Sequence, residues 1–572
     1  MNKKRYKNKL YETRYVNDIK DLIYSSTLLF SGRNAYLVKD QPGGDYKPIT
    51  YQQLKEDMNA LGTALLHHGL EGKKIAVIGE NRYEWVLTYL AVCCGVGVIV
   101  PIERELHPTE IKSLIERSGA SAVVFSGKSE EIVNDAISGL DFIEYKINMD
   151  AIKHEQNLLS LKLLLEQGKQ LVQSGNRDYI DKEIKNDVMS ILLFTSGTTG
   201  VSKGVMLSHK NIMSNVMNMS KMVNVEGQIG LSVLPMHHTY EMTCHILTAL
   251  YQGCCVAICE GLKHIVKNMV EARANVMLGV PLLFESMYNR IWKQAEKSGK
   301  ANKLRRAIAI SKFFRLYNTR LPRLIFKDIH DILGGGINLL ISGAAAIDPK
   351  VVEDFNAMGL NMIQGYGLTE SSPIVAVNKD RYSKWDSVGL PMPGTEIRIE
   401  NADENGIGEI VCKSDSVMLG YFDDPEATAE ALKDGWLHTG DYGYLDKDNF
   451  LYITGRKKNV IVTKNGKNIF PEEIEYHLGK SDFISECVVY GLNEEKKGEV
   501  VVCAEIFPNY EAIKEKLGHI CESQVRALID EAIEKVNNIM PLYKRVRRFN
   551  IRDVEFEKTP TKKIKRHLVG QK

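Results

Sequence analysis

The sequence predicts an α/β protein with a large N-terminal domain of βαβ-type subdomains plus a β-rich subdomain, followed by a small α+β C-terminal domain. First, the length of 572 residues exceeds what one hydrophobic core supports. Second, helical and strand-like patterns alternate through most of the chain. Third, short strands and turns replace this alternation from about residue 395. The 74 basic and 72 acidic side chains leave a formal charge of only +2, and nothing in it points to nucleic acid.

Residues 50–125 show the alternation most clearly. Helical patterns there are separated by β-rich runs such as KKIAVIG, GVGVIVP and SAVVFSG, which is the sequence form of βαβ units around a parallel sheet. The same alternation returns near residues 231–281 and 339–366. The most apolar stretch, Leu90 to Pro101, is shorter than the roughly 20 residues that cross a bilayer. We interpret it as a buried helix end that leads into a strand.

The β-rich subdomain is expected at about residues 390–455, where N-G and D-K-D-N sequences supply turns. After Arg456 the pattern becomes mixed again. Pro471 opens a predicted helix whose first turn contains Glu472 and Glu473, as the positive end of a helix favours. We therefore predict an N-terminal domain at 1–457 and a C-terminal domain at 458–572.

Two segments are unusually basic. Residues 286–332 form a long helical pattern, and residues 541–572 contain eleven Lys or Arg against three acids. Composition alone favours a solvated face for both.

The cysteines and the N-terminal segment indicate the cellular compartment that is expected for the protein. The adjacent pairs Cys93-Cys94 and Cys254-Cys255 lack zinc-binding spacing and indicate reduced, buried thiols. The basic N-terminus continues into YETRYVNDIKDLIY without the apolar segment of a signal peptide. A cytoplasmic location is expected, with membrane association left open.

The strongest local signal is a loop of small and hydroxylic residues after the apolar run VMSILL. Glycines free the backbone N–H groups to face an anion, the hydroxyls add donors and the lysine adds charge. Phosphate is the natural ligand, although the spacing is not that of a Walker loop. The candidate binding residues are Thr195, Ser196, Gly197, Thr198, Thr199, Gly200 and Lys203.

This loop resembles the phosphate-binding signature of the adenylate-forming superfamily of acyl-CoA synthetases, luciferases and peptide-synthetase adenylation domains. That signature usually has Pro where this chain has Ser202. The resemblance runs from about Thr50 to Arg566. Further motifs of the family follow in the family's order: Ser342-Gly-Ala-Ala-Ala346, Gln364-Gly-Tyr-Gly-Leu-Thr-Glu370, Gly435-Trp-Leu-His-Thr-Gly-Asp441, Gly455-Arg-Lys-Lys458 and Thr559-Pro-Thr-Lys-Lys563.

The resemblance implies ATP, Mg²⁺ and coenzyme A, and it assigns roles residue by residue. Tyr366 would lie on adenine, Thr369 near the α-phosphate, and Glu370 with Thr195 at magnesium. Asp441 would hold the ribose hydroxyls, and His238 would lie beside the substrate carboxylate. The remaining nucleotide-site residues are Gly343, Ala344, Ala345, Gln364, Gly365, Gly367, Arg456, Lys464, Gly466 and Lys563. Lys563, Glu370, Thr195, Arg456 and His238 are the catalytic candidates, because attack of a carboxylate on the α-phosphorus requires preorganised positive charge.

The family resemblance also implies that the C-terminal domain is mobile. Lys458 aligns with the hinge about which this domain rotates between two half-reactions. Rotation would exchange Lys563 for the segment 464–467 at the active site. Thioester formation would follow adenylate formation in this second arrangement.

The substrate is expected to be a long-chain fatty acid, because the segment from Val280 and the long basic insertion resemble the long-chain acyl-CoA synthetase branch. Leu282, commonly Arg there, and Lys562, often Gly, depart from the pattern. Three alternatives stay open: a fatty acyl-AMP ligase that serves a carrier protein, an aryl or medium-chain acid CoA ligase, and a silent nucleotide-binding protein. The other expected partners are small molecules. Peripheral membrane contact is left open, because the basic KKIKR ending could meet anionic lipid. The sequence does not indicate an oligomeric state.

Overall fold

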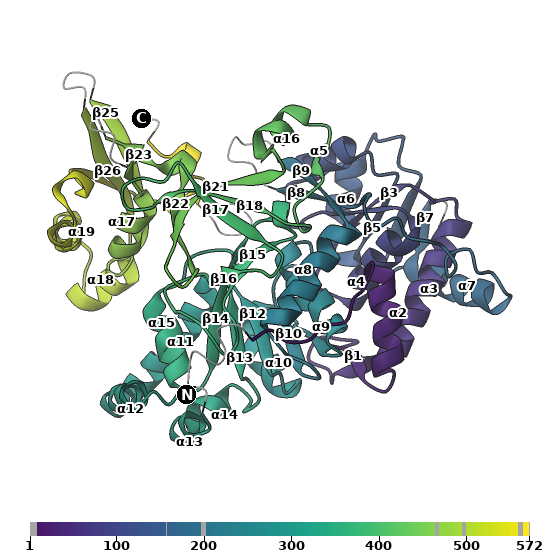
Figure 1. Ribbon diagram of the computed structural model, residues 1–572, viewed down its shortest axis with the longest axis horizontal. Coiled ribbons are helices and arrows are strands. Elements are labelled where there is room, and N and C mark those ends of the chain that lie inside the picture. The colour runs from purple at the N-terminus through teal and green to yellow at the C-terminus, as the bar shows by residue number, and fades with distance from the viewer. Residues whose placement is uncertain are drawn as a thin grey trace.

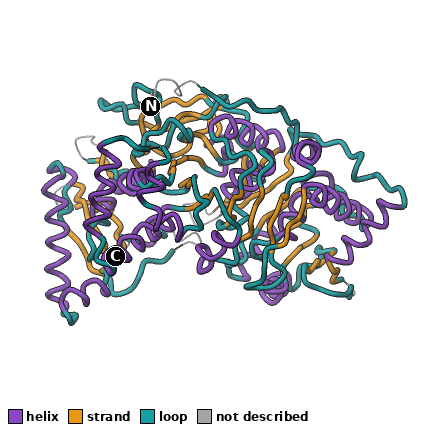
Figure 2. Tube along the Cα trace, turned by 90° about the horizontal axis from the view of Figure 1, so that it is seen from below, coloured by secondary structure: helices purple, strands orange, loops and turns teal. Residues whose placement is uncertain are grey.

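A computed structural model describes residues 9–155, 157–195, 202–317, 319–463, 468–494, 499–558 and 564–570. Figure 1 shows a large body made by the N-terminal part of the chain and a smaller unit, containing α17 to α19, at one end. Figure 2 shows the same helices and strands in a view turned by 90°.

Two large sheets with mainly parallel strands form the body. Within the described residues, one has the order β16 (Leu390–Pro391), β15 (Ile374–Val377), β14 (Asn361–Gly367), β13 (Leu339–Ser342), β12 (Val276–Gly279), β10 (Ile229–Ser232), β11 (Cys255–Ile258), β1 (Asn34–Val38), β2 (Lys47–Thr50). The other has the order β19 (Gly420–Tyr421), β9 (Lys203–Ser208), β8 (Met189–Thr195), β4 (Val98–Pro101), β3 (Lys74–Ile78), β5 (Ala122–Phe125), β6 (Tyr145–Asn148), β7 (Leu158–Ser160).

Helices fill the space between the two sheets and cover their outer faces. Strand β3 shows why: Ile75 and Val77 belong to one apolar core and Ala76 and Ile78 to another, so the strand is buried on both faces. The central core contains α2 (Ile19–Phe30), α3 (Tyr51–His67), α4 (Tyr83–Ala91), α8 (His209–Met222), the π-helix η3 (Tyr240–Leu247) and α9 (Thr248–Tyr251). The outer helices are α5 (Pro108–Ser118) and α6 (Glu130–Ile137) on one sheet, and α10 (Ile265–Glu271), α11 (Pro281–Lys297), α12 (Ala301–Phe313) and α15 (Pro349–Ala357) on the other; α7 (Leu161–Gln173) packs against α3.

A small antiparallel sheet leads from the body to the C-terminal unit. It contains β17 (Glu396–Glu400), β18 (Gly408–Lys413), β20 (Leu432–Lys433), β21 (Trp436–Leu445) and β22 (Leu451–Arg456), with α16 (Pro425–Ala431) beside it. The C-terminal unit has its own apolar core. Its elements are β23 (Ile461–Val462), β24 (Asn468–Ile469), α17 (Pro471–Leu478), β25 (Ile484–Glu494), β26 (Glu499–Pro508), α18 (Tyr510–Leu517), α19 (Glu522–Ile539) and β27 (Arg548–Ile551).

The predicted fold class is confirmed. Helix α4 ends at Ala91, a π-helical turn follows, and β4 ends at Pro101, as the apolar stretch predicted. The helix that Pro471 was expected to open is α17. The two adjacent cysteine pairs are buried thiols. The boundary at Lys458 and the mobility of the C-terminal domain stay predictions.

The basic segment 286–332 is helical, as expected, but it is divided between four helices. Gly299, with φ +67°, follows the end of α11, where a left-handed residue commonly terminates a helix. Beyond α12 come the short helices α13 (Leu321–Ile325), which has Pro322 in its first turn, and α14 (Lys327–Ile332). Within the described ranges, no helix combines the length and apolar character needed to cross a bilayer.

Candidate active site

Several predicted nucleotide-site residues lie at the carboxyl ends of parallel strands, where open α/β sheets bind ligands. Gly343, Ala344 and Ala345 follow β13, and Gln364 to Gly367 end β14. A Cβ on Gly343 would lie 2.8 Å from Cζ of Tyr240, so glycine lets this ring pack against the backbone. The Tyr240 hydroxyl donates to the carbonyl of Ile341 over 3.0 Å. Ala344 has φ +70°, a left-handed conformation that is often found at functional sites.

Tyr366, Asp441 and Arg456 form one connected group. Asp441 on β21 faces Arg456 on β22 in the antiparallel register. The Tyr366 hydroxyl donates to Asp441 Oδ2 over 2.6 Å, and Arg456 Nε lies 2.7 Å from Oδ1. Burial, reinforced by the Asp441 carboxylate, raises the pKa of Tyr366 well above its ordinary value. The phenol therefore stays a hydrogen-bond donor, and the carboxylate is fixed in position.

Glu370 belongs to a second group, near the predicted phosphate loop. Tyr421 donates to Glu370 Oε1 over 2.9 Å. Lys203 Nζ lies 4.9 Å from the centre of the Tyr421 ring, and Lys203 faces Thr195 across the β8–β9 register. Burial and the Glu370 carboxylate raise the pKa of Tyr421. Tyr421 thus contacts two predicted site residues, Glu370 and Lys203. Sequence analysis missed it because the strand that positions it, β9, lies more than 200 residues earlier.

The glycines and Gln364 have identifiable local contacts. A Cβ on Gly367 would lie 1.8 Å from the carbonyl oxygen of Pro373, so only glycine permits this approach. The Gln364 side chain is buried and donates to the carbonyl of Trp385. Its predicted role in nucleotide binding stays a prediction, as do the roles of the other site residues. Ser196, Gly197, Thr198, Thr199, Gly200, Lys464, Gly466 and Lys563 lie outside the described residues.

His238 lies in the loop after β10 beside His237, with 4.1 Å between their ring centres. Glu103, from the loop after β4, approaches His237, with 3.8 Å between Oε2 and Nε2. Burial raises the pKa of Glu103 to about 7 and lowers the pKa of His237 well below its ordinary value. The structure therefore adds an acid with a shifted pKa to the histidine motif, and sequence analysis missed it.

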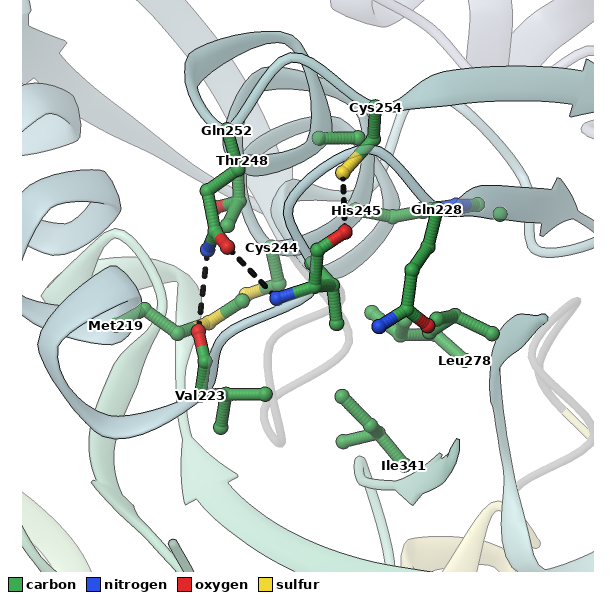
Figure 3. Close-up of a pocket in the computed structure, with 14 residues that line it drawn as sticks. Met219, Val223, Gln228, Cys244, His245, Thr248, Gln252, Cys254, Leu278 and Ile341 are labelled. Atoms are coloured by element: carbon green, nitrogen blue, oxygen red, sulfur yellow. Dashed lines mark hydrogen bonds between the residues drawn. The ribbon is translucent and has the colours of Figure 1, made fainter. Parts of the chain in front are cut away.

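An apolar pocket is lined in part by β13, the strand that leads to the predicted nucleotide-site residues (Figure 3). Ile341, one of its lining residues, immediately precedes Ser342 and Gly343. The pocket runs between β10, β12, β13 and the helices α8, η3 and α9, and its present volume is about 30 Å³. Its lining is Met219, Val223, Val225, Gln228, Gly230, Cys244, His245, Thr248, Ala249, Gln252, Cys254, Val276, Leu278 and Ile341. This volume holds one or two water molecules, so a larger ligand requires side chains to move.

His245 is one of the polar side chains that line this pocket. His245 and Glu241 are both buried, one helical turn apart, with 2.8 Å between Nδ1 and Oε1. A Cβ on Gly230 would lie 2.2 Å from His245 Nε2, so the glycine makes room for the imidazole. At the end of the pocket remote from Ile341, Gln252 donates to the carbonyl of Val223 over 3.1 Å. The Glu241–His245 pair was not predicted, although its i, i+4 spacing was visible in the sequence.

The family follows from a comparison with known proteins. A model described as AMP-binding enzyme matches residues 30–422. The chain belongs to the AMP-binding enzyme family. A second model, of the C-terminal domain of AMP-binding enzymes, matches residues 458–572 of this AMP-binding enzyme.

Two relatives illustrate the similarity. Long-chain-fatty-acid–CoA ligase 5 of Rattus norvegicus is 30% identical over 568 residues, which is 91% of this chain and 82% of the rat protein. Long-chain-fatty-acid–CoA ligase FadD15 of Mycobacterium bovis is 27% identical over 563 residues, which is 92% of this chain and 91% of the relative.

Solved structures confirm the fold of the AMP-binding enzyme. The anthranilate CoA ligase AuaEII, in complex with anthranoyl-AMP, superposes with a TM-score of 0.75 at 18% identity, covering 100% of this chain and 98% of the other. A fatty acyl CoA synthetase of Mycobacterium tuberculosis superposes with a TM-score of 0.65 at 22% identity, covering 97% of each chain.

Proposed function

We propose that this AMP-binding enzyme is a long-chain fatty acid CoA ligase, which converts a fatty acid to its acyl-adenylate and then to the acyl-CoA thioester, releasing pyrophosphate and AMP. The observation that supports this most is the apolar pocket lined by Ile341, two residues before the predicted nucleotide-site residue Gly343. An apolar chain in the pocket would direct its carboxylate toward the nucleotide. The names of the relatives support the same substrate class.

The residues present fit ATP and Mg²⁺ as ligands. The fixed carboxylate of Asp441 offers acceptors for ribose hydroxyls, and the Tyr366 ring lies next to it. Glu370 supplies the carboxylate oxygen that magnesium prefers, and Tyr421 orients it. When bound, magnesium would neutralise charge on the phosphates.

The enzyme's own side chains would stabilise the reaction in defined places. Arg456 neutralises Asp441, and Lys203 places a positive charge at the mouth of the predicted phosphate loop. We propose His238 beside the acyl carboxylate and Lys563 at the reacting atoms. Loss of one preorganised donor of this kind typically costs about 3 kcal/mol, roughly a hundredfold in rate. Rotation about Lys458 between the half-reactions is part of the proposal, and so are the cytoplasmic location and peripheral contact with membrane.

The test is pyrophosphate release from ATP and magnesium with acids from C2 to C18 and benzoates, with and without CoA, for wild type and Lys563→Ala. Lys565→Ala, in the same basic motif, is the matched control. The proposal expects C12 to C18 acids to react best, to need CoA for turnover, and to lose turnover only in Lys563→Ala.

Other results would select an alternative. Turnover with a carrier protein but not CoA would indicate a fatty acyl-AMP ligase, and preference for benzoates would indicate an aryl-acid ligase. No acid-dependent release at all would favour a silent nucleotide-binding protein.

A further inference from the structure

Helix α12 and the residue that follows it have an apolar face that points into solvent. Ile310, Phe313 and Phe314 follow the i, i+3, i+4 spacing of one helical face, and all three are exposed, Phe313 by 82%. The opposite face holds the helix on the body. There Ser311 donates to the carbonyl of Ala357 over 2.6 Å, and Lys312 Nζ lies 2.6 Å from Asp354 Oδ1.

Helix α13 repeats this arrangement. Leu321, Leu324 and Ile325 have the same spacing and are exposed, Leu324 by 73%. By contrast, Pro322 and Phe326 are buried. Helices of globular proteins ordinarily direct their apolar stripe toward the core and a polar face toward water. Two successive helices with exposed apolar faces therefore indicate an interaction surface.

The segment that carries these apolar faces is rich in basic residues. Residues 300–332 contain nine Lys or Arg and only two acids, Asp328 and Asp331. Both acids face lysines: Lys300 Nζ lies 3.4 Å from Asp328, and Lys327 pairs with Asp331. The cations closest in sequence to the exposed apolar residues are exposed or half-buried; they are Arg306, Arg315, Arg320 and Arg323.

We propose that the exposed face of α12 and α13, here called the α12–α13 face, docks on an anionic bilayer surface. Phe, Leu and Ile side chains would enter the boundary between head groups and acyl chains, while Arg and Lys contact the anionic head groups. Each cation near such a surface contributes on the order of 1 kcal/mol. A second copy of the chain is a poorer occupant, because it would bring the same excess of positive charge against this one.

The location suits such docking. Figure 1 shows α12, α13 and α14 along the lower margin of the body, with β25 and β26 of the C-terminal unit at the upper left. The inference does not depend on which acid the enzyme activates. It assigns a particular surface to the membrane contact, in place of the C-terminal basic segment that the sequence suggested.

The experiment is co-sedimentation of the whole 572-residue chain with vesicles of phosphatidylcholine alone, or of phosphatidylcholine mixed with phosphatidylglycerol as the anionic lipid. The double variant Phe313→Ser/Phe314→Ser and the variant Leu324→Ser are compared with wild type. Leu28→Ser, which removes a leucine that is 83% exposed on α2, is the matched control. Circular dichroism and thermal melting establish that each variant is folded.

We expect wild type and Leu28→Ser to bind the phosphatidylglycerol vesicles, and the α12–α13 variants to bind at least tenfold more weakly. Binding should also weaken as salt is raised, because head-group attraction is screened. Equal binding by the double variant and wild type would overturn the assignment. The assignment would also be overturned if light scattering showed a dimer for wild type but not for the α12–α13 variants, while vesicle binding stayed the same. That result would identify the face as a contact between copies of the chain.

Discussion

We predict that the imidazole of His245, one of the lining residues, limits the depth of the apolar pocket, and removing it tests this. The single change His245→Ala would leave the buried Glu241 carboxyl without its hydrogen-bond partner, at a cost of about 1–3 kcal/mol. We therefore choose His245→Ala with Glu241→Gln, which replaces the carboxyl as well. The double variant should extend the pocket past Gly230 toward Gln252 and Cys254, which line its far end.

The expected gain follows from the burial of methylene groups. Each buried CH₂ contributes about 0.8 kcal/mol. Two additional methylenes in the extended pocket contribute about 1.6 kcal/mol, which is roughly a 15-fold increase in kcat/KM. The preferred acid should therefore become about two carbons longer than that of the wild type.

The assay is kcat/KM for pyrophosphate release across saturated acids from C8 to C18. Met219→Leu, a volume-conserving change in the same wall, is the control and should keep the wild-type preference. Gly230→Ala is the reciprocal test. Its new Cβ would lie 2.2 Å from His245 Nε2, so the imidazole must move further into the pocket and the preference should become shorter. An unchanged chain-length preference in both His245 and Gly230 variants would refute the reasoning.

Three further changes test other parts of the site. Asp441→Asn should raise the KM for ATP about 10- to 100-fold, since it weakens the charged contact to Arg456 and the acceptor for ribose; an unaltered KM in steady-state kinetics would contradict this. Lys458→Pro should spare adenylate formation and impair thioester formation, and equal loss of both half-reactions would count against a hinge there. Glu103 has a pKa raised from 4.5 to about 7, so its ionisation destabilises the fold as pH rises through this range. Glu103→Gln should therefore be more stable than wild type by up to about 3 kcal/mol at pH 8 and equal to it near pH 4.5. Urea unfolding of both proteins at the two pH values measures this, and a difference in unfolding free energy that does not change with pH would contradict it.

Local sequence patterns predicted the fold well because the chain follows local rules over long stretches. The β-rich runs became β3, β4 and β5, since they are short and bounded by glycine or by turns. Pro471 began a helix because its fixed φ suits the first turn. The long helical pattern at 286–332 was divided at points where Gly299 and Pro322 interrupt it, and these breakers were visible in the sequence.

The site was predictable only where residues are adjacent in the chain. Tyr366 and Glu370 belong to one motif, whereas Tyr421 and Glu103 reach their partners through strand pairing and loop packing. Such contacts are set by the tertiary arrangement. The Glu241–His245 pair is different: its spacing is local, but its significance depends on burial against Gly230, which no periodicity reveals.

The parallel pairing of β1 with β11 has a consequence for how this protein is made. Tyr36 lies opposite Val256, so a strand near the start of the chain waits for one that is translated about 220 residues later. At about 5–20 residues per second, the ribosome needs roughly 10–45 s to deliver that partner. During this interval the nascent N-terminal segment, from α2 through β2, cannot complete its sheet, and the exposed edge of β1 is a candidate binding site for chaperones.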